Sequence, residues 1–141
     1  MPTTKEQLIE GLNEDLAGEL GTIIRYSWQA SKAFGPNGAE LRKLFTKEIP
    51  DELGHASFLM DVIVDLGGDP TTTPMKFEKP KSLDDMVKLD LEMELQDVEN
   101  YTSRAEQADE LNEVELKVRL EEMAADESEH ARDLRRILRG M

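Results

Sequence analysis

Two short motifs in the sequence combine a carboxylate and an imidazole at the same spacing. Glu52 and His55 form a Glu-x-x-His motif in the stretch DELGHA, and Glu127 and His130 form another in DESEHA. Residues three apart in a helix lie on the same face, so each motif directs both groups to one side. A single motif of this kind is common in ordinary helices. Here the two motifs use both histidines of the chain, which favours a shared chemical role.

The two halves of the chain repeat each other at an offset of 75 residues (127 − 52 = 75). The offset carries the first motif onto the second and relates further residues of the same type. The polar pairs are Glu19 and Glu94, Glu52 and Glu127, His55 and His130, Tyr26 and Tyr101, and Asp51 and Asp126. We therefore expect one helical hairpin that has been duplicated, with a pseudo-twofold axis between the copies.

Four glutamates and both histidines occupy positions where a buried helical seam should be apolar. Four unpaired carboxylates in a core would each cost several kcal/mol or would remain protonated. Two divalent cations would balance the four negative charges and remove this cost. The sequence therefore predicts a dinuclear metal site, which would be the catalytic centre, held by Glu19, Glu52, His55, Glu94, Glu127 and His130.

The types of ligand narrow the choice of metal. One glutamate from each of two helices, with Glu-x-x-His from the other two, is the ligand set of di-iron and di-manganese carboxylate bundles. Such sites suit iron or manganese better than copper, and zinc can occupy them as an inert substitute. Iron is the better candidate because two iron ions can supply two electrons to O₂ without an organic cofactor.

Four long helices are expected to position these side chains. Apolar residues recur at spacings of three and four along residues 4–34, 38–66, 82–109 and 112–139, which predicts amphipathic helices. The stretch GPNG at residues 35–38 predicts a tight turn, and Ser82 predicts the N-terminal cap of the third helix. The expected fold is an all-α four-helix bundle, in which residues 1–141 form a single domain.

The connection between the second and third helices is long and rich in proline. Its fourteen residues, 68–81, would span about 46 Å if extended, and a helix of 28 residues is about 42 Å long. We therefore expect one long crossover along the bundle, which makes the second and third helices parallel. The alternative is a disordered linker.

Composition excludes several classes of function. Lys and Arg total 17 and Asp and Glu total 31, so the formal charge is −14, which repels nucleic acid and anionic membranes. The absence of cysteine excludes disulfides, iron–sulfur clusters and thiol catalysis. The N-terminus lacks the apolar stretch of a signal peptide, and no segment is apolar enough to span a membrane. We expect a cytoplasmic protein without nucleic-acid or membrane partners.

Four stretches of the sequence resemble the ligand motifs of bacterioferritins. They are LAGELGTIIRYSWQA around Glu19, DELGHA around Glu52, LEMELQDVENY around Glu94 and DESEHA around Glu127. The similarity extends over nearly the whole chain and places it in the ferritin-like di-iron superfamily. It implies a four-helix bundle with a dinuclear ferroxidase centre.

The resemblance also implies a role for each matching residue. Glu19 and Glu94 would be terminal ligands, Glu52 and Glu127 would bridge the two ions, and His55 and His130 would each bind one ion. Tyr26 and Tyr101 match tyrosines near the centre. Asp51 and Asp126 match outer positions, where a carboxylate can accept the second ring N–H of a histidine.

Two departures from bacterioferritins affect the expected cofactor and assembly. Bacterioferritins bind haem through a methionine directly after the first bridging glutamate, and Leu53 stands there, so we expect no haem. The sequence ends after the fourth helix, without the short fifth helix of cage ferritins. We therefore expect a homodimer in preference to a hollow shell, with Trp28 as a candidate subunit contact.

Three functions agree with these features. The first is a ferroxidase that oxidises Fe²⁺ with O₂ or H₂O₂ and sequesters or detoxifies iron. The second is another di-iron or di-manganese oxidoreductase, such as a rubrerythrin-like peroxidase. Rubrerythrins carry an extra carboxylate ligand and a cysteine-rich electron-transfer domain, so a chain without cysteine would need an external electron donor. The third is a bundle that metal stabilises without catalysis.

Overall fold

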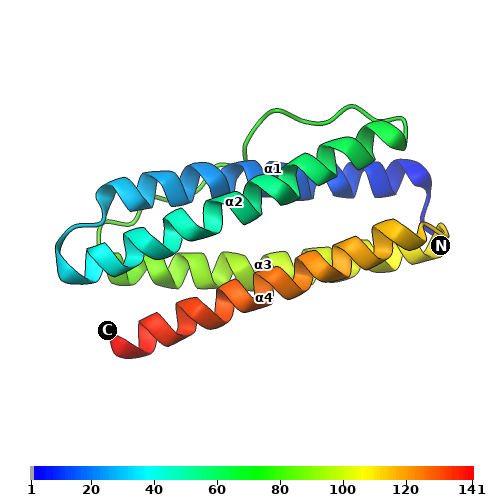
Figure 1. Cartoon of the computed structure of the whole chain (residues 1–141). Helices are drawn as coiled ribbons and strands as arrows, with labels where there is room; N and C mark the ends of the chain where they lie inside the picture. Colours follow the sequence, from blue (N-terminus) through cyan, green and yellow to red (C-terminus); the bar gives the residue numbers. More distant parts are fainter. Residues whose placement is uncertain (1) are drawn as a thin grey trace.

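The computed structural model describes residues 2–141 and contains four helices. They are α1 (Lys5–Lys32), α2 (Gly35–Asp65), α3 (Leu83–Glu110) and α4 (Val114–Gly140). Short connections make α1 and α2 one antiparallel hairpin and α3 and α4 another, and the hairpins lie side by side (Figure 1). This arrangement confirms the expected all-α four-helix bundle. No helix in the described part of the chain is long and apolar enough to cross a membrane.

The helix ends follow local sequence signals, with one difference from expectation. Ser82 caps α3 by accepting a hydrogen bond from the backbone N–H of Asp85 at 3.1 Å, as expected. The GPNG stretch, however, forms the first turn of α2 and not a separate turn. Pro36 fits there because the first N–H groups of a helix have no helical partner to lose. The chain therefore reverses its direction at Ala33 and Phe34, just before the GPNG stretch.

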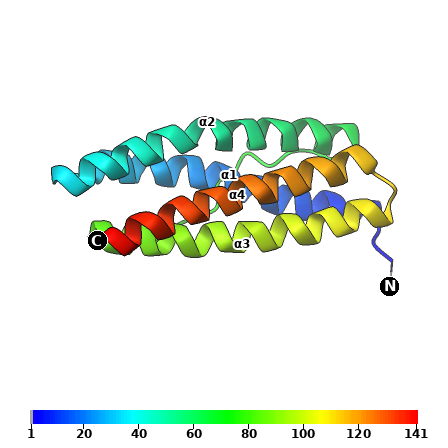
Figure 2. The same ribbon diagram turned by 60° about the horizontal axis from the view of Figure 1, so that its bottom comes forward.

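Residues 67–82, which we call the strap, form the long crossover between α2 and α3. They run back along α1 without regular secondary structure, so that α2 and α3 point the same way (Figure 2). The side chain of Asn13 binds the strap twice, donating to the Asp69 carbonyl at 3.2 Å and accepting from Thr71 N–H at 2.8 Å. The Ala17 carbonyl accepts from Met75 N–H at 2.9 Å. These bonds confirm an extended crossover and exclude a detached linker.

The strap approaches α1 most closely at Gly21. A Cβ atom at this position would lie 2.6 Å from the carbonyl oxygen of Met75, so only glycine leaves room for the strap backbone. Farther along, Trp28 packs against Phe77 of the strap with ring centroids 6.2 Å apart. Trp28 thus makes a contact within its own chain, where the sequence suggested a subunit contact.

The apolar core is divided into two clusters by a polar middle. One cluster includes Leu12, Leu59 and Leu120, and the other includes Phe45 and Leu134. Each cluster also contains one of the two symmetry-related tyrosines, and each tyrosine hydroxyl contacts a buried glutamate. The predicted ligands therefore lie between two close-packed apolar regions, which hold the four helices at a constant spacing.

Candidate metal centre

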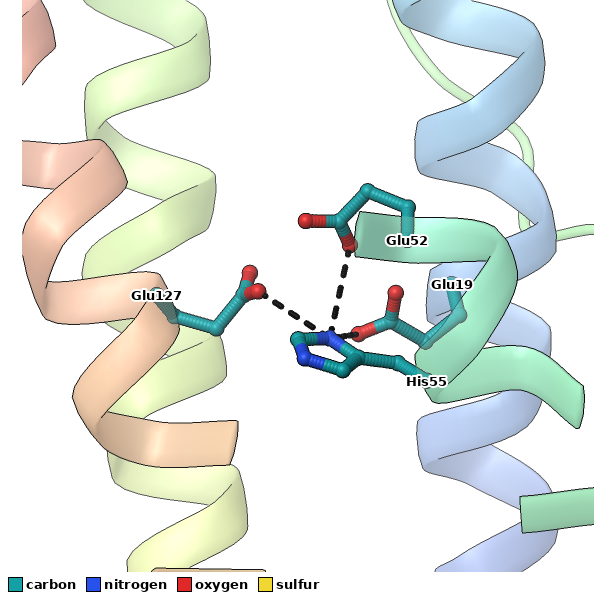
Figure 3. A group of neighbouring side chains, drawn as sticks. All are labelled: Glu19, Glu52, His55 and Glu127. Carbon is teal, nitrogen blue, oxygen red and sulfur yellow. Dashed lines mark ion pairs between the residues drawn. The ribbon is translucent and has the colours of Figure 1, made fainter. Parts of the chain in front are cut away.

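The first group of candidate ligands surrounds the Nδ1 atom of His55. This nitrogen lies 3.5 Å from Glu19 Oε1, 4.0 Å from Glu52 Oε2 and 3.3 Å from Glu127 Oε1. Figure 3 shows Glu127 reaching from α4 toward His55 on α2, with Glu19 beside it on α1. All four residues are buried. Three helices therefore direct one nitrogen and three carboxylates into one small space.

The second group surrounds the Nδ1 atom of His130 and repeats the first. This nitrogen lies 3.2 Å from Glu52 Oε1, 3.6 Å from Glu127 Oε1 and 3.8 Å from Glu94 Oε2. In each group, one ligand atom per residue can be chosen so that all lie within 4.8 Å of one another. Glu52 and Glu127 belong to both groups, whereas the other glutamates belong to one group each. The structure thus brings together all six residues that the sequence singled out.

Most of the buried side-chain atoms that lack a hydrogen-bond partner in residues 2–141 belong to these two groups. They are Glu19 Oε2, Glu94 Oε2, both carboxylate oxygens of Glu52 and Glu127, and the Nδ1 atoms of His55 and His130. Buried polar atoms without a partner are rare because each has lost its hydration without compensation. Carboxylate oxygens and imidazole nitrogens are also ligands that divalent iron, manganese and zinc accept. The residues present therefore fit two divalent cations.

The four residues expected near the centre contact its members across the pseudo-twofold axis. Tyr26 donates a hydrogen bond to Glu94, and Tyr101 donates one to Glu19. The outward Nε2 atom of His55 lies 2.9 Å from Asp126 Oδ2, and that of His130 lies 3.2 Å from Asp51 Oδ2. A carboxylate at Nε2 holds the proton there and leaves Nδ1 free to bind a cation.

Carboxylates keep both imidazoles protonated when no cation is bound. Burial alone would lower the pKa of His55, but the close approach and charge of the Glu19 carboxylate, with the charge of Glu52, raise it to about 9. Burial also opposes the charged form of His130. The contacts of its ring nitrogens with the carboxylates of Glu48 and then Glu52 outweigh burial and raise its pKa far above the ordinary histidine value. At neutral pH, two imidazolium ions thus offset part of the negative charge.

The carboxylates of the centre hold protons unequally. Burial, reinforced by Glu19, raises the pKa of Glu52 well above its ordinary range, and burial with Glu94 does the same for Glu127. Burial would also raise the pKa of Glu94, but its contacts with Glu127 and His130 lower it. Burial therefore favours the protonated form of the two glutamates shared by both groups. Cations entering the centre would replace these protons and release them to solvent.

The structure adds two carboxylates that the sequence analysis did not identify. Glu48 is buried and forms an ion pair with Nε2 of His130. Asp97 lies about one turn after Glu94 on α3, and burial, followed by the charges of Glu94 and Glu52, raises its pKa to about 8. Helical spacing could have found both, because Glu48 lies four residues before Glu52 and Asp97 lies three residues after Glu94.

Two further charged pairs lie in the interior, away from the ligand atoms. Arg25 Nε donates to Asp90 Oδ1 at 2.8 Å, and Arg104 Nε donates to Asp15 Oδ2 at 2.9 Å. Gln29 Nε2 also donates to Asp90 at 2.9 Å. The offset of 75 residues relates Asp15 to Asp90, so the sequence repeat contained a signal for these pairs too. They bind one hairpin to the other on either side of the centre.

Leu53, which replaces the haem-binding methionine of bacterioferritins, lies on the outside of α2. The residue is 52% exposed and belongs to neither group of candidate ligands. The expectation that the protein binds no haem therefore stays a prediction.

A model of the ferritin-like domain family matches residues 9–141 of the chain. No curated protein matched the sequence. Among solved structures, a ferritin-like, diiron-carboxylate protein from Bacillus anthracis is 42% identical, with a TM-score of 0.93, over 95% of this chain and 96% of that chain.

Two more distant structures share the fold. The bacterioferritin of Desulfovibrio desulfuricans is 25% identical, with a TM-score of 0.87, over 94% of this chain and 78% of that chain. A protein from Bacteroides fragilis, described as a dodecameric thioferritin, is 22% identical, with a TM-score of 0.90, over 98% of this chain and 88% of that chain. Because that protein is dodecameric, the comparisons do not support the expected preference for a dimer.

Proposed function

This chain belongs to the ferritin-like domain family, and on that premise we propose that it is a ferroxidase, which oxidises Fe²⁺ to Fe³⁺ with O₂ or H₂O₂. The observation that carries the proposal is the set of unpartnered oxygen and nitrogen atoms at the centre of the bundle. The similar Bacillus anthracis protein is described as a diiron-carboxylate protein, and the Desulfovibrio bacterioferritin has a diiron site.

In this proposal, each Fe²⁺ substrate ion binds one group of side chains. Glu19 and His55 bind one ion, Glu94 and His130 bind the other, and Glu52 and Glu127 bridge them. This assignment follows the membership of the two groups, in which only Glu52 and Glu127 are shared. Tyr26 and Tyr101 orient the two terminal glutamates, while Asp51 and Asp126 orient the two histidines.

The centre holds its substrate ions close enough to react with one oxidant molecule. Metals of a two-metal site lie about 3.5–4 Å apart. Two Fe²⁺ ions then give one electron each to the oxidant. With H₂O₂ and two protons, the products are two Fe³⁺ and two H₂O; with O₂ and two protons, they are two Fe³⁺ and one H₂O₂. The acidic surface, with a formal charge of −14, attracts the cationic substrate.

One observation favours a second function, a di-iron or di-manganese oxidoreductase with an external electron donor. Asp97 adds a carboxylate beside the six proposed ligands, and rubrerythrins carry an extra carboxylate ligand. Under this alternative, the metal ions are resident cofactors that return to the reduced state after each turnover.

Anaerobic loading with two Fe²⁺ per chain, followed by O₂ or H₂O₂, distinguishes the functions. We expect rapid oxidation, followed as ultraviolet absorbance of Fe³⁺, with iron retained by the protein. Glu127→Gln should abolish the rapid phase, because it removes the charge of a bridging ligand. Glu129→Gln, on the exposed face of the same helix, is the matched control and should behave as the original protein.

The other outcomes each favour a different function. A centre that oxidises once and then turns over only with an added electron donor favours the second function. Bound iron that is not oxidised favours a metal-stabilised bundle without catalysis. Wild-type kinetics in Glu127→Gln would refute the proposed site.

A further inference from the structure

The repeat that relates the two hairpins is broken at a buried carboxylate that contacts the centre. Glu48 lies on α2, one turn before Glu52, and its counterpart on α4 is Met123 (48 + 75 = 123). Both side chains are buried, with residue exposures of 4% for Glu48 and 5% for Met123. The chain therefore places a carboxylate on one side of the axis and an uncharged thioether at the equivalent place on the other.

Glu48 gives the two histidines different surroundings. Two carboxylates face Nε2 of His130: Glu48, as an ion pair, and Asp51, at 3.2 Å. Among the described residues, the carboxylate that faces Nε2 of His55 is that of Asp126, at 2.9 Å, and its side chain is 50% exposed. Met123 packs in the apolar cluster on that side. His130 thus has one more negative charge behind it than His55, and that extra charge is buried.

The other buried charges near the centre do not cancel this difference. The pairs Arg25–Asp90 and Arg104–Asp15 are each neutral overall, and their aspartates are related by the repeat. Asp97, which the repeat relates to the uncharged Thr22, is also unmatched, but its charge acts on Glu94 and Glu52, and it forms no ion pair with either histidine among the described residues. Glu48 is therefore a buried charge that contacts one histidine and has no charged counterpart at the other.

We propose that Glu48 makes the two cation positions unequal, so that the position of Glu94 and His130 fills first and that of Glu19 and His55 fills second. The inference rests on the dinuclear site of the proposed function. A carboxylate behind a ligating imidazole makes the imidazole a better donor and fixes its orientation, which changes metal affinity by about 10–100-fold. A buried charge acts more strongly than an exposed one because water screens it less.

Cobalt, which binds oxygen and nitrogen ligands without being oxidised here, is the probe. Metal-free protein is titrated anaerobically with Co²⁺, followed by visible absorption, and crystals with one equivalent of Co²⁺ are measured by anomalous diffraction. We expect two binding steps, with the first equivalent beside His130. In Glu48→Met, which copies the residue at the equivalent position, the first step should weaken about 10–100-fold and one equivalent should divide between both positions.

Two further variants separate charge from shape and from folding. Glu48→Gln keeps the size and a hydrogen-bond acceptor but removes the charge, and it should also weaken the first step. Met123→Glu introduces the missing carboxylate beside His55 and should strengthen the second step. If Glu48→Met fails to fold, as judged by circular dichroism, Glu48→Gln and Met123→Glu test whether the carboxylate charge sets the order in which the two positions fill.

The outcomes also distinguish this inference from the proposed function. Equal filling of both positions in the original protein, or unchanged two-step binding in both Glu48 variants, would overturn the role of Glu48 alone. Binding of fewer than two Co²⁺ ions at the six side chains would refute the dinuclear site itself.

Discussion

At the scale of single residues, the two tyrosine hydroxyls connect the apolar core with the candidate metal centre. Each donates a hydrogen bond to a buried glutamate of the other hairpin. We predict that Tyr26→Phe and Tyr101→Phe each lower the free energy of unfolding by about 1.5–3 kcal/mol, the usual range for a hydrogen bond to a charged group. Phenylalanine keeps the ring packing, including the stacking of Tyr26 on Phe45 at 5.3 Å.

Urea denaturation of metal-free protein measures this loss. Because the repeat relates the two tyrosines, the two variants should lose similar amounts of stability. A variant as stable as the original protein would show that its hydroxyl makes no net contribution.

The imidazole of His55 makes the stability of the metal-free protein depend on pH. Its pKa is about 9 in the folded protein and near 6.5 in the unfolded chain. Its contribution is therefore fully present below pH 6.5 and is lost as pH rises through 9, by about 3 kcal/mol in all. Asp97, with a pKa raised to about 8, lowers stability over the same interval, since its charged form is disfavoured in the fold.

Unfolding in urea at pH 6.5 and pH 9, with a chelator present, tests this dependence. The original protein should be less stable at pH 9. His55→Gln should reduce the difference but not remove it, because Asp97 still titrates. Equal or greater stability at pH 9 in the original protein would contradict the prediction.

At the scale of elements, the contact between α1 and the strap depends on a missing side chain. In Gly21→Ala, the new Cβ would meet the Met75 carbonyl oxygen at 2.6 Å and push the strap away from the helix. We expect a loss of about 1–3 kcal/mol, as for other overpacked contacts. The hydrogen bond from Met75 N–H to the Ala17 carbonyl should weaken as well.

Gly18, on the same helix, provides a matched control. A Cβ atom there has no neighbour within 4 Å, so Gly18→Ala should stabilise the protein by up to about 1 kcal/mol through helix propensity alone. Thermal unfolding and amide hydrogen exchange of residues 69–75 measure both effects. Equal stability of the two variants would show that the strap does not need this close approach.

At the scale of the whole molecule, the centre links all four helices, so cations should stabilise the entire bundle. The candidate ligands come from α1, α2, α3 and α4, and unfolding any helix removes at least one of them. At a free concentration 100 times its dissociation constant, one bound ion contributes about 2.7 kcal/mol. For a chain of this length, that raises the unfolding temperature by roughly 8–10 °C.

Calorimetry with Co²⁺ or Zn²⁺, neither of which needs an oxidant, measures the change. Glu127→Gln should show a smaller rise, whereas Glu129→Gln should match the original protein. An unfolding temperature that does not respond to either cation would contradict binding at the centre.

Local features of the sequence were sufficient to predict the helices and the residues gathered at the centre. Helix periodicity and the side a residue faces depend on nearest neighbours along the chain, so spacings of three and four identify both. The duplicated hairpin added a second constraint, because any residue on the inner face of one half has a counterpart on the other. Glu19, Glu52, His55 and their counterparts therefore came together as expected.

Only the tertiary structure decided which other polar residues are buried and what they contact. Glu48 and Asp97 resemble the many surface carboxylates of an acidic chain until neighbouring helices cover them. Trp28 resembles an interface residue until the strap, distant in sequence, packs against it. The burial and electrostatic environment of a side chain depend on contacts between segments that are distant in the sequence. Local residue spacing does not predict those contacts. For the same reason, the unequal surroundings of the two histidines became visible only in the structure, where Glu48 pairs with His130.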